Sequence, residues 1–212
     1  MQNPSLPNPE TNQTGYTIIE LGIALTIIAV LIVAGLAGVN TVLTNSRANS
    51  QIEESGVVLA KLQSMLTSTS VSGMNTAGAV GSSYFPASRV SGTGSTTAVA
   101  SRFTGSEFVA SNSAELTSTT HGVAAAINVG AIYTITGVPK AVCANIASSL
   151  ATLANAAWIH TTATAEGTAG AVGGFTASTS QIKAPGGQVL GAKVGTQCNA
   201  ADTVNLAFFL RP

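Results

Sequence analysis

The longest uninterrupted apolar segment of the chain lies near its N-terminus and predicts one long helix. After Glu20 no charged residue occurs until Arg47, and residues 21–39 are almost entirely Leu, Ile, Val, Ala and Gly. About 20 helical residues span the roughly 30 Å hydrocarbon core of a bilayer. The segment is longer than the apolar region of about 7–15 residues in a secretory signal peptide. We therefore expect residues 16–43 to form a membrane-spanning helix rather than a cleaved signal or a buried core helix.

The pattern becomes polar from Asn40 but keeps the spacing of a helix. The apolar residues that recur on one face are Ile52, Leu59, Leu62 and Leu66. The polar residues at the other positions include Arg47, Gln51, Glu54, Lys61 and Gln63. This spacing is typical of an amphipathic helix, which needs a partner surface for its apolar stripe. The two patterns together predict a continuous helix over residues 16–67 with an apolar first half and an amphipathic second half.

The C-terminal part shows the patterns of an α+β domain. Residues 131–137 alternate apolar and polar side chains, and residues 203–210 have good strand composition. Residues 189–194 are a weaker strand candidate. Residues 140–158 carry apolar side chains at helical spacing behind Pro139, which suits a first helical turn. We expect residues 68–212 to form a globular head with an antiparallel sheet and one further helix.

The segment between the long helix and this sheet is rich in Ser, Thr, Gly and Ala. Residues 67–125 therefore suggest a long, neutral, partly ordered connection, and residues 88–101 suggest a loop flanked by Arg89 and Arg102. Tyr84-Phe85-Pro86 and Phe103 would anchor it to the core. An alternative is an exposed variable surface whose many hydroxyl groups carry glycans.

Composition and motifs argue against several classes of function. Only 8% of the residues are charged, with eight acidic and eight basic side chains, so no basic patch predicts a nucleic-acid partner. The sequence lacks the common nucleophile, metalloprotease and phosphate-loop motifs. Glu53 and Glu54 are adjacent and point to different sides of a helix, so they do not form a catalytic pair of carboxylates. Asp202 is a single carboxylate, whereas a calcium ion takes six or more oxygen ligands. The spacing of His121 and His160 is not that of metal ligands. We predict no enzymatic activity, cofactor or metal site.

The chain has two cysteines, Cys143 and Cys198. An export-type N-terminus favours a disulfide between them, because such bonds persist in oxidising compartments. Closing so long a loop is worth roughly 4 kcal/mol in the chain-entropy account. Free buried thiols or a metal site remain as alternatives, although zinc needs about four ligands.

The N-terminus resembles that of a type IV prepilin, and most closely a type IVb pilin. The matching residues are Gly15, the following segment Tyr16-Thr17-Ile18-Ile19-Glu20-Leu21 and the apolar run behind it. The resemblance implies that residues 1–15 are a leader and that a prepilin peptidase cuts after Gly15. It implies N-methylation of the new amine at Tyr16, and a role in assembly for Glu20, which would meet that amine on a neighbouring subunit. The widely spaced cysteine pair and a mature chain of about this length fit the same subfamily.

The resemblance also implies a fold and a function. The fold is the α-β roll, an antiparallel sheet laid across the amphipathic half of the long helix. The function is that of a structural subunit, held first in the bacterial inner membrane and then polymerised with itself by the pilus assembly machinery into an extracellular filament. Such filaments serve adhesion, aggregation, motility or mating contact.

Two other functions fit the sequence. One is a minor pilin, or a pseudopilin of a pilus or type II secretion system. The other is a single-span membrane protein with an exported binding domain that never polymerises. The leader favours the second of these, since it has no Lys or Arg and carries only Glu10, whereas the leaders of pilins are usually basic.

Overall fold

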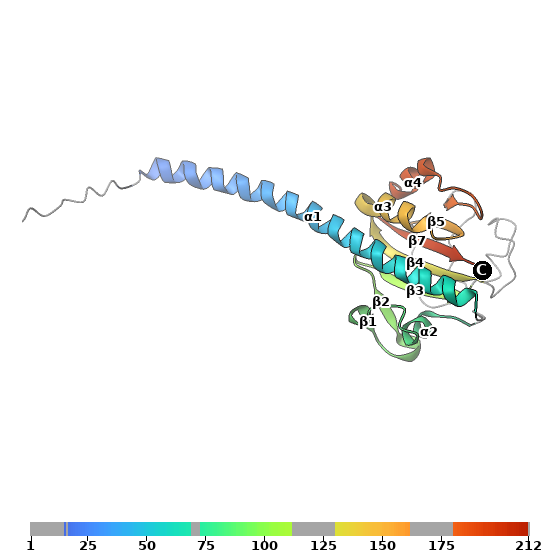
Figure 1. Cartoon of the computed structure of the whole chain (residues 1–212). Helices are drawn as coiled ribbons and strands as arrows, with labels where there is room; N and C mark the ends of the chain where they lie inside the picture. The colour runs from blue at the N-terminus through green and yellow to red at the C-terminus, as the bar shows by residue number, and fades with distance from the viewer. Residues whose placement is uncertain (1–14, 16, 69–72, 112–129, 162–179, 212) are drawn as a thin grey trace, which may run out of the picture. The chain divides into compact units, whose positions relative to one another are not determined.

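The computed structural model describes residues 15, 17–68, 73–111, 130–161 and 180–211. The chain divides into two compact units, residues up to Leu43 and residues from Thr44 onward. Helix α1 (Ile18–Leu66, 49 residues) passes from the first unit into the second (Figure 1). The predicted long helix is therefore confirmed, although the expected start at Tyr16 lies outside the described residues.

The second unit contains an antiparallel sheet whose described strands number seven, in the order β1-β2-β3-β4-β7-β5-β6 (Figure 1). The strands are β1 (Val90–Ser91), β2 (Ala98–Ala100), β3 (Ser106–Ser111), β4 (Ala131–Pro139), β5 (Ala156–His160), β6 (Gln181–Lys183) and β7 (Thr203–Leu210). The last strand of the chain, β7, is inserted between β4 and β5 and pairs with both. The C-terminal segment therefore holds the two halves of the sheet together. The strands expected at residues 131–137 and 203–210 are confirmed.

Among its described residues, the second unit also contains one longer helix and four shorter helical elements. They are α2 (Thr76–Gly81), the 3₁₀ turns η1 (Ala87–Arg89) and η2 (Gly94–Thr96), α3 (Lys140–Ala151) and α4 (Gly191–Cys198). Buried side chains of α3 and α4 belong to the same hydrophobic cluster as those of α1. These helices therefore share one face of the sheet with the second half of α1.

Strand register sorts the side chains of the sheet between its two faces. Tyr133 on β4 pairs with Phe208 on β7, and both side chains belong to the cluster beneath the helices. The neighbouring pair, Ile132 and Phe209, belongs to a second cluster that also contains Trp158. Successive side chains of a strand point to opposite faces. Both faces of the central strands are therefore buried, and the polar Thr134 in the alternating segment 131–137 is buried with them.

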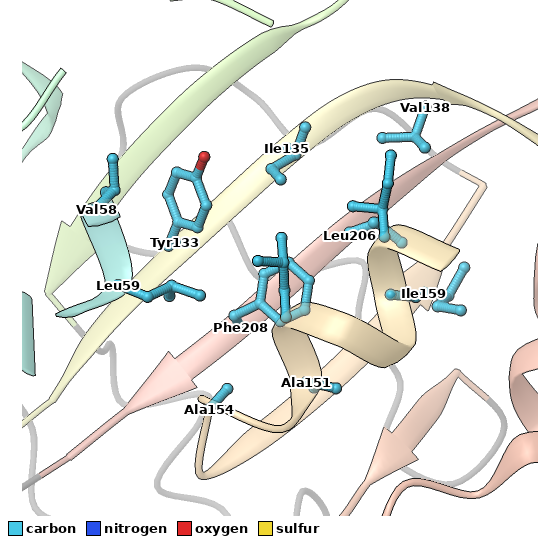
Figure 2. Packing of buried hydrophobic residues seen from close by; sticks show 14 of the residues in the cluster. Val58, Leu59, Tyr133, Ile135, Val138, Ala151, Ala154, Ile159, Leu206 and Phe208 are labelled. Carbon is cyan, nitrogen blue, oxygen red and sulfur yellow. The ribbon is translucent and has the colours of Figure 1, made fainter. Parts of the chain in front are cut away.

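The second half of α1 packs its apolar stripe on this sheet. Leu59 and Leu62 are fully buried, Leu66 is nearly so, and Ile52 is partly buried against the same core. Figure 2 shows Leu59 beside Tyr133 and Phe208, from β4 and β7. The apolar surface expected from the periodicity is confirmed.

One predicted helix ends too late. The sequence predicts a helix over residues 140–158, but α3 ends at Ala151, and Trp158 lies in the centre of β5. The Lys183 ammonium donates hydrogen bonds to the carbonyl oxygens of Ala151 and Ala154, at 2.9 and 2.7 Å, where the helix stops. The following residues pair with β7, so long-range pairing overrides the local helical pattern.

The strand suggested at residues 189–194 is also wrong, because α4 begins at Gly191. Residues 88–101 are not a loop throughout, since they contain β1, η2 and β2. The connection expected over residues 67–125 likewise includes α2 and β3, while residues 112–129 lie outside the described part. The anchors are confirmed: Phe85 is buried, and Tyr84 and Phe103 pack partly buried against the core.

A bulge in β4 depends on glycine. The register with β7 shifts between Ile135 and Val138, and Gly137 at this shift has a φ of +68°. A Cβ on Gly137 would lie 2.7 Å from the backbone nitrogen of Gly105, which itself lies against Thr136. The left-handed backbone and the close approach of the two chains both require a residue without a side chain.

Candidate assembly site

The start of α1 contains the residues expected to direct assembly. The side-chain oxygen of Thr17 accepts a hydrogen bond of 3.3 Å from the backbone amide of Glu20, and the Thr17 carbonyl accepts one of 3.1 Å from that of Leu21. Thr17 thus caps the helix, and Thr-x-x-Glu is the sequence of a capping box. Glu20 is exposed and lies in the first turn, where a negative charge favours the helix dipole. Glu20 therefore has a local structural role besides any role in assembly.

The expected cleavage site can be placed only in part. Gly15 is exposed and Thr17 precedes the first residue of the helix, whereas Tyr16 and the leader residues 1–14 lie outside the described part. The peptide bond expected to be cut therefore lies just before α1, not within it. Cleavage, methylation and the assembly role of Glu20 stay predictions.

The first unit exposes an apolar surface. Every large aliphatic side chain from Ile18 to Leu43 has between 48% and 90% of its area exposed. Each such side chain costs roughly 1.5–3 kcal/mol to leave in water. By length and composition this part of α1 is able to cross a membrane. Its surface requires lipid or other apolar chains around it.

The cysteine prediction is confirmed. Cys143 in α3 and Cys198 at the end of α4 form a disulfide, with their Cα atoms 5.6 Å apart and a sequence separation of 55 residues. Both cysteines are buried in the main cluster. The bond ties the two small helices to each other where they cover the sheet.

The second unit contains a buried polar network that the sequence interpretation missed. Glu107 on β3 is fully buried, as are Gln51 and Ser55 on α1. The Gln51 amide donates to Ser55 Oγ at 2.7 Å and to Glu107 Oε1 at 2.9 Å. The Tyr133 hydroxyl donates to Glu107 Oε2 at 2.6 Å. Since that proton is committed, Ser55 donates to the Tyr133 oxygen at 2.9 Å, which closes a ring of hydrogen bonds between α1, β3 and β4.

Two arginines balance the charge of this network. Arg89 forms an ion pair with the buried carboxylate of Glu107 and another, at 2.8 Å, with Glu54. Glu54 also pairs with Arg102, whose backbone amide donates to Gln51 Oε1 at 2.9 Å. Two carboxylates and two guanidinium groups therefore form a neutral cluster. Such neutrality is what makes a buried charge tolerable.

Protonation follows from these contacts. Burial raises the pKa of Tyr133 well above its usual value, and the negative charge of Glu107 raises it further. The hydrogen bond from Arg102 to Glu54 raises the pKa of that guanidinium. The tyrosine therefore stays neutral and remains a hydrogen-bond donor.

A partial signal for this network was present in the sequence. Gln51 and Ser55 lie four residues apart and continue the stripe of Leu59 and Leu62. Their position in that stripe predicts burial, although Gln51 is expected above among the polar residues outside the apolar face. No local pattern marked Glu107, because its partners come from segments far apart in the chain.

A surface cleft borders the network. It has a volume of about 470 Å³, and its wall is formed by Ser50, Glu53, Glu54, Val57, Lys61, Ser83, Tyr84, Phe85, Pro86 and Arg102. One side of the cleft is a stripe of α1, and the other is the segment just before η1. The Lys61 ammonium donates to the Ser83 carbonyl at 2.8 Å, which joins the two sides.

The other candidate residues do not form a chemical site. Asp202 pairs with Lys140 at 2.7 Å, and this cation holds the pKa of Asp202 below its usual value. His160 lies on β5, while His121 and the glycine-rich residues 167–174 are outside the described part. Among the described residues, no group of three or more His, Cys, Asp and Glu side chains could hold a metal ion.

Comparison with known proteins supports the architecture. No protein-family profile matches the sequence, and no curated protein sequence is similar to it. The structure is similar to a type IVb pilin from Salmonella typhi, with a TM-score of 0.50 and 16% identity, over 77% of this chain and 99% of that one. A second similar structure is TcpA, a type IV pilin from Vibrio cholerae El Tor biotype (TM-score 0.45, 15% identity, 78% and 98% coverage). With its long N-terminal helix and antiparallel sheet, the chain has the type IV pilin fold.

Proposed function

We propose that this chain is the major structural subunit of a type IV pilus, of the type IVb class. The observation that carries the proposal is the combination of a pilin fold with a helix whose large aliphatic side chains from Ile18 to Leu43 are all exposed. Such a helix is unfavourable in water unless lipid or other copies of the chain cover its aliphatic side chains. The inner membrane would hold the helix first, and neighbouring copies would cover it in an extracellular filament.

The assembly steps follow from the start of α1. A prepilin peptidase would hydrolyse the peptide bond after Gly15, so that residues 1–15 leave and Tyr16 gains a free amine. N-methylation of that amine would preserve its positive charge. Glu20 would then pair with the amine of a neighbouring copy as the assembly machinery adds each subunit. A carboxylate in an apolar surrounding requires such a cation, because an isolated charge costs several kcal/mol there.

Glu20→Gln tests this role better than Glu20→Ala. Glutamine preserves the capping-box pattern with Thr17 but removes the charge, so the helix start is retained. We expect normal levels of subunit in the membrane and a sharp loss of filaments from the cell surface. Asp202→Asn removes a charge from an exposed pair in the head without changing α1 and is the control for subunit stability in the membrane. Wild-type filament yield from Glu20→Gln would refute the proposed role of this carboxylate.

A further inference from the structure

Two charged side chains on the second half of α1 have no partner in the part of the chain that the structure describes. Arg47 and Glu53 are exposed, and neither forms a hydrogen bond or ion pair within the described residues. By contrast, Glu54, Glu107 and Asp202 each pair with a cation of their own chain. In a chain with only 8% charged residues this difference is informative.

Arg47 and Glu53 do not pair within one helix. They lie six residues apart, which is about 9 Å along the axis, whereas side chains that contact each other on one helix are three or four residues apart. A second, parallel copy of α1 displaced by about 9 Å along the axis would bring its Arg47 level with Glu53. The pairing of Glu20 with the amine of residue 16 requires a displacement in the same direction, because the carboxylate again has the higher residue number.

The surroundings of Glu53 suit an arginine. Glu53 lines the cleft of about 470 Å³, together with Val57, Tyr84 and Pro86. A guanidinium group pairs with a carboxylate and also stacks on aromatic and apolar surfaces. Two cations of the same chain line the cleft, and one of them, Arg102, is already paired with Glu54. The other, Lys61, lies about two turns after Glu53 along α1 and donates a hydrogen bond to the Ser83 carbonyl.

We propose that this cleft is a docking site for a second copy of the chain, whose Arg47 enters it and pairs with Glu53. The argument rests on charge complementarity between the two exposed residues and on the offset that parallel copies of one helix require. The proposal builds on the proposed filament function, since it names a contact between neighbouring subunits. It adds a charged contact in the polar half of α1 to the proposed pairing of Glu20 at the start of the apolar half.

A charge exchange tests the contact in cells that produce the full chain. We expect Arg47→Glu and Glu53→Arg to lower the yield of sheared filaments roughly fivefold or more, because each variant places like charges together. The double variant should restore most of the yield. Exchanging the exposed pair Lys140 and Asp202 is the matched control and should leave the yield unchanged. Formation of the native disulfide reports on folding of every variant.

Cross-linking gives an independent measurement. The double variant Arg47→Cys, Glu53→Cys should form a ladder of covalent oligomers in intact filaments under oxidation, whereas each single variant should not. Filaments without a ladder, single variants with wild-type yield, or a double exchange as defective as the single ones would each overturn the contact. These results would leave the filament function standing. If the wild-type chain forms no filaments at all, the proposed function and this contact both fail.

Discussion

Glu107→Gln is the most informative change in the head, because it removes one charge from the buried network and alters little else. The carboxylate is fully buried and accepts hydrogen bonds from Gln51, Tyr133 and Arg89. Glutamine has the same shape, but it leaves the Arg89 cation without its buried partner. Removing one member of a buried ion pair typically costs about 3–5 kcal/mol. With a denaturant slope of about 2 kcal/mol per molar urea, the unfolding midpoint should fall by about 1.5–2.5 M.

The assay is urea unfolding of the full chain in detergent, followed by the fluorescence of its one tryptophan, Trp158, which is buried in β5. A double-mutant cycle isolates the charge interaction. Arg89→Met should destabilise strongly by itself, since it leaves Glu107 unpaired. The combined variant should be more stable than the sum of the two losses by about 2 kcal/mol.

The exposed pair of Lys140 and Asp202 supplies the control. Asp202→Asn removes the same kind of charge from a pair that water surrounds, so its midpoint should not change measurably. A midpoint shift below about 0.5 M urea for Glu107→Gln would refute the argument that burial decides the cost. Strict additivity of the Glu107 and Arg89 changes would refute it as well.

Three further predictions concern the head. The pKa of Tyr133 is raised on folding, so its contribution to stability is complete below its pKa in the unfolded chain, about 10, and is lost as the pH rises above that value. Unfolding measured at increasing pH should therefore show an alkaline loss of stability, and Tyr133→Phe should reduce that loss. Gly137→Ala should lower the free energy of unfolding by at least about 1 kcal/mol, because its φ is +68° and Gly105 leaves no space for a Cβ atom. Gly81→Ala is the control and should not lower it, since Gly81 is exposed and a Cβ there has no atom within 4 Å. Cys143→Ser should reduce the yield of folded subunit and cost about 2–5 kcal/mol, measured by thermal unfolding with and without reductant; an equal melting temperature for the two forms would contradict it.

The parts of the fold that were predictable from the sequence are those in which local pattern and tertiary environment agree. The long helix and its stripe of Leu59 and Leu62 follow from periodicity, and β7 follows from its β-branched and aromatic composition. Trp158 was misassigned because its neighbours continue a helical pattern, while the edge of β7 offers it a strand partner. Competition of this kind is decided by contacts far away in sequence.

The buried network shows the same limit at a candidate site. Gln51 and Ser55 could have been placed by their spacing, but Glu107 sits in a segment of Ser, Thr and Gly whose composition suggests a loop. Its burial depends on Arg89 and Tyr133, which no spacing rule connects to it. Conversely, the features at the N-terminus of α1 can be recognised from the sequence, because they lie close together along the chain. They are Gly15, an aromatic residue, a carboxylate and a long apolar run.

The central claim is that the chain is processed and assembled into a surface filament, and the mass of the intact protein tests it most directly. The protein would be sheared from the surface of producing cells and measured without reduction. The account predicts a mass equal to residues 16–212 with one added methyl group and two hydrogens fewer, for the disulfide between Cys143 and Cys198. A mass that retains residues 1–15, or absence of the protein from the sheared fraction, would contradict it.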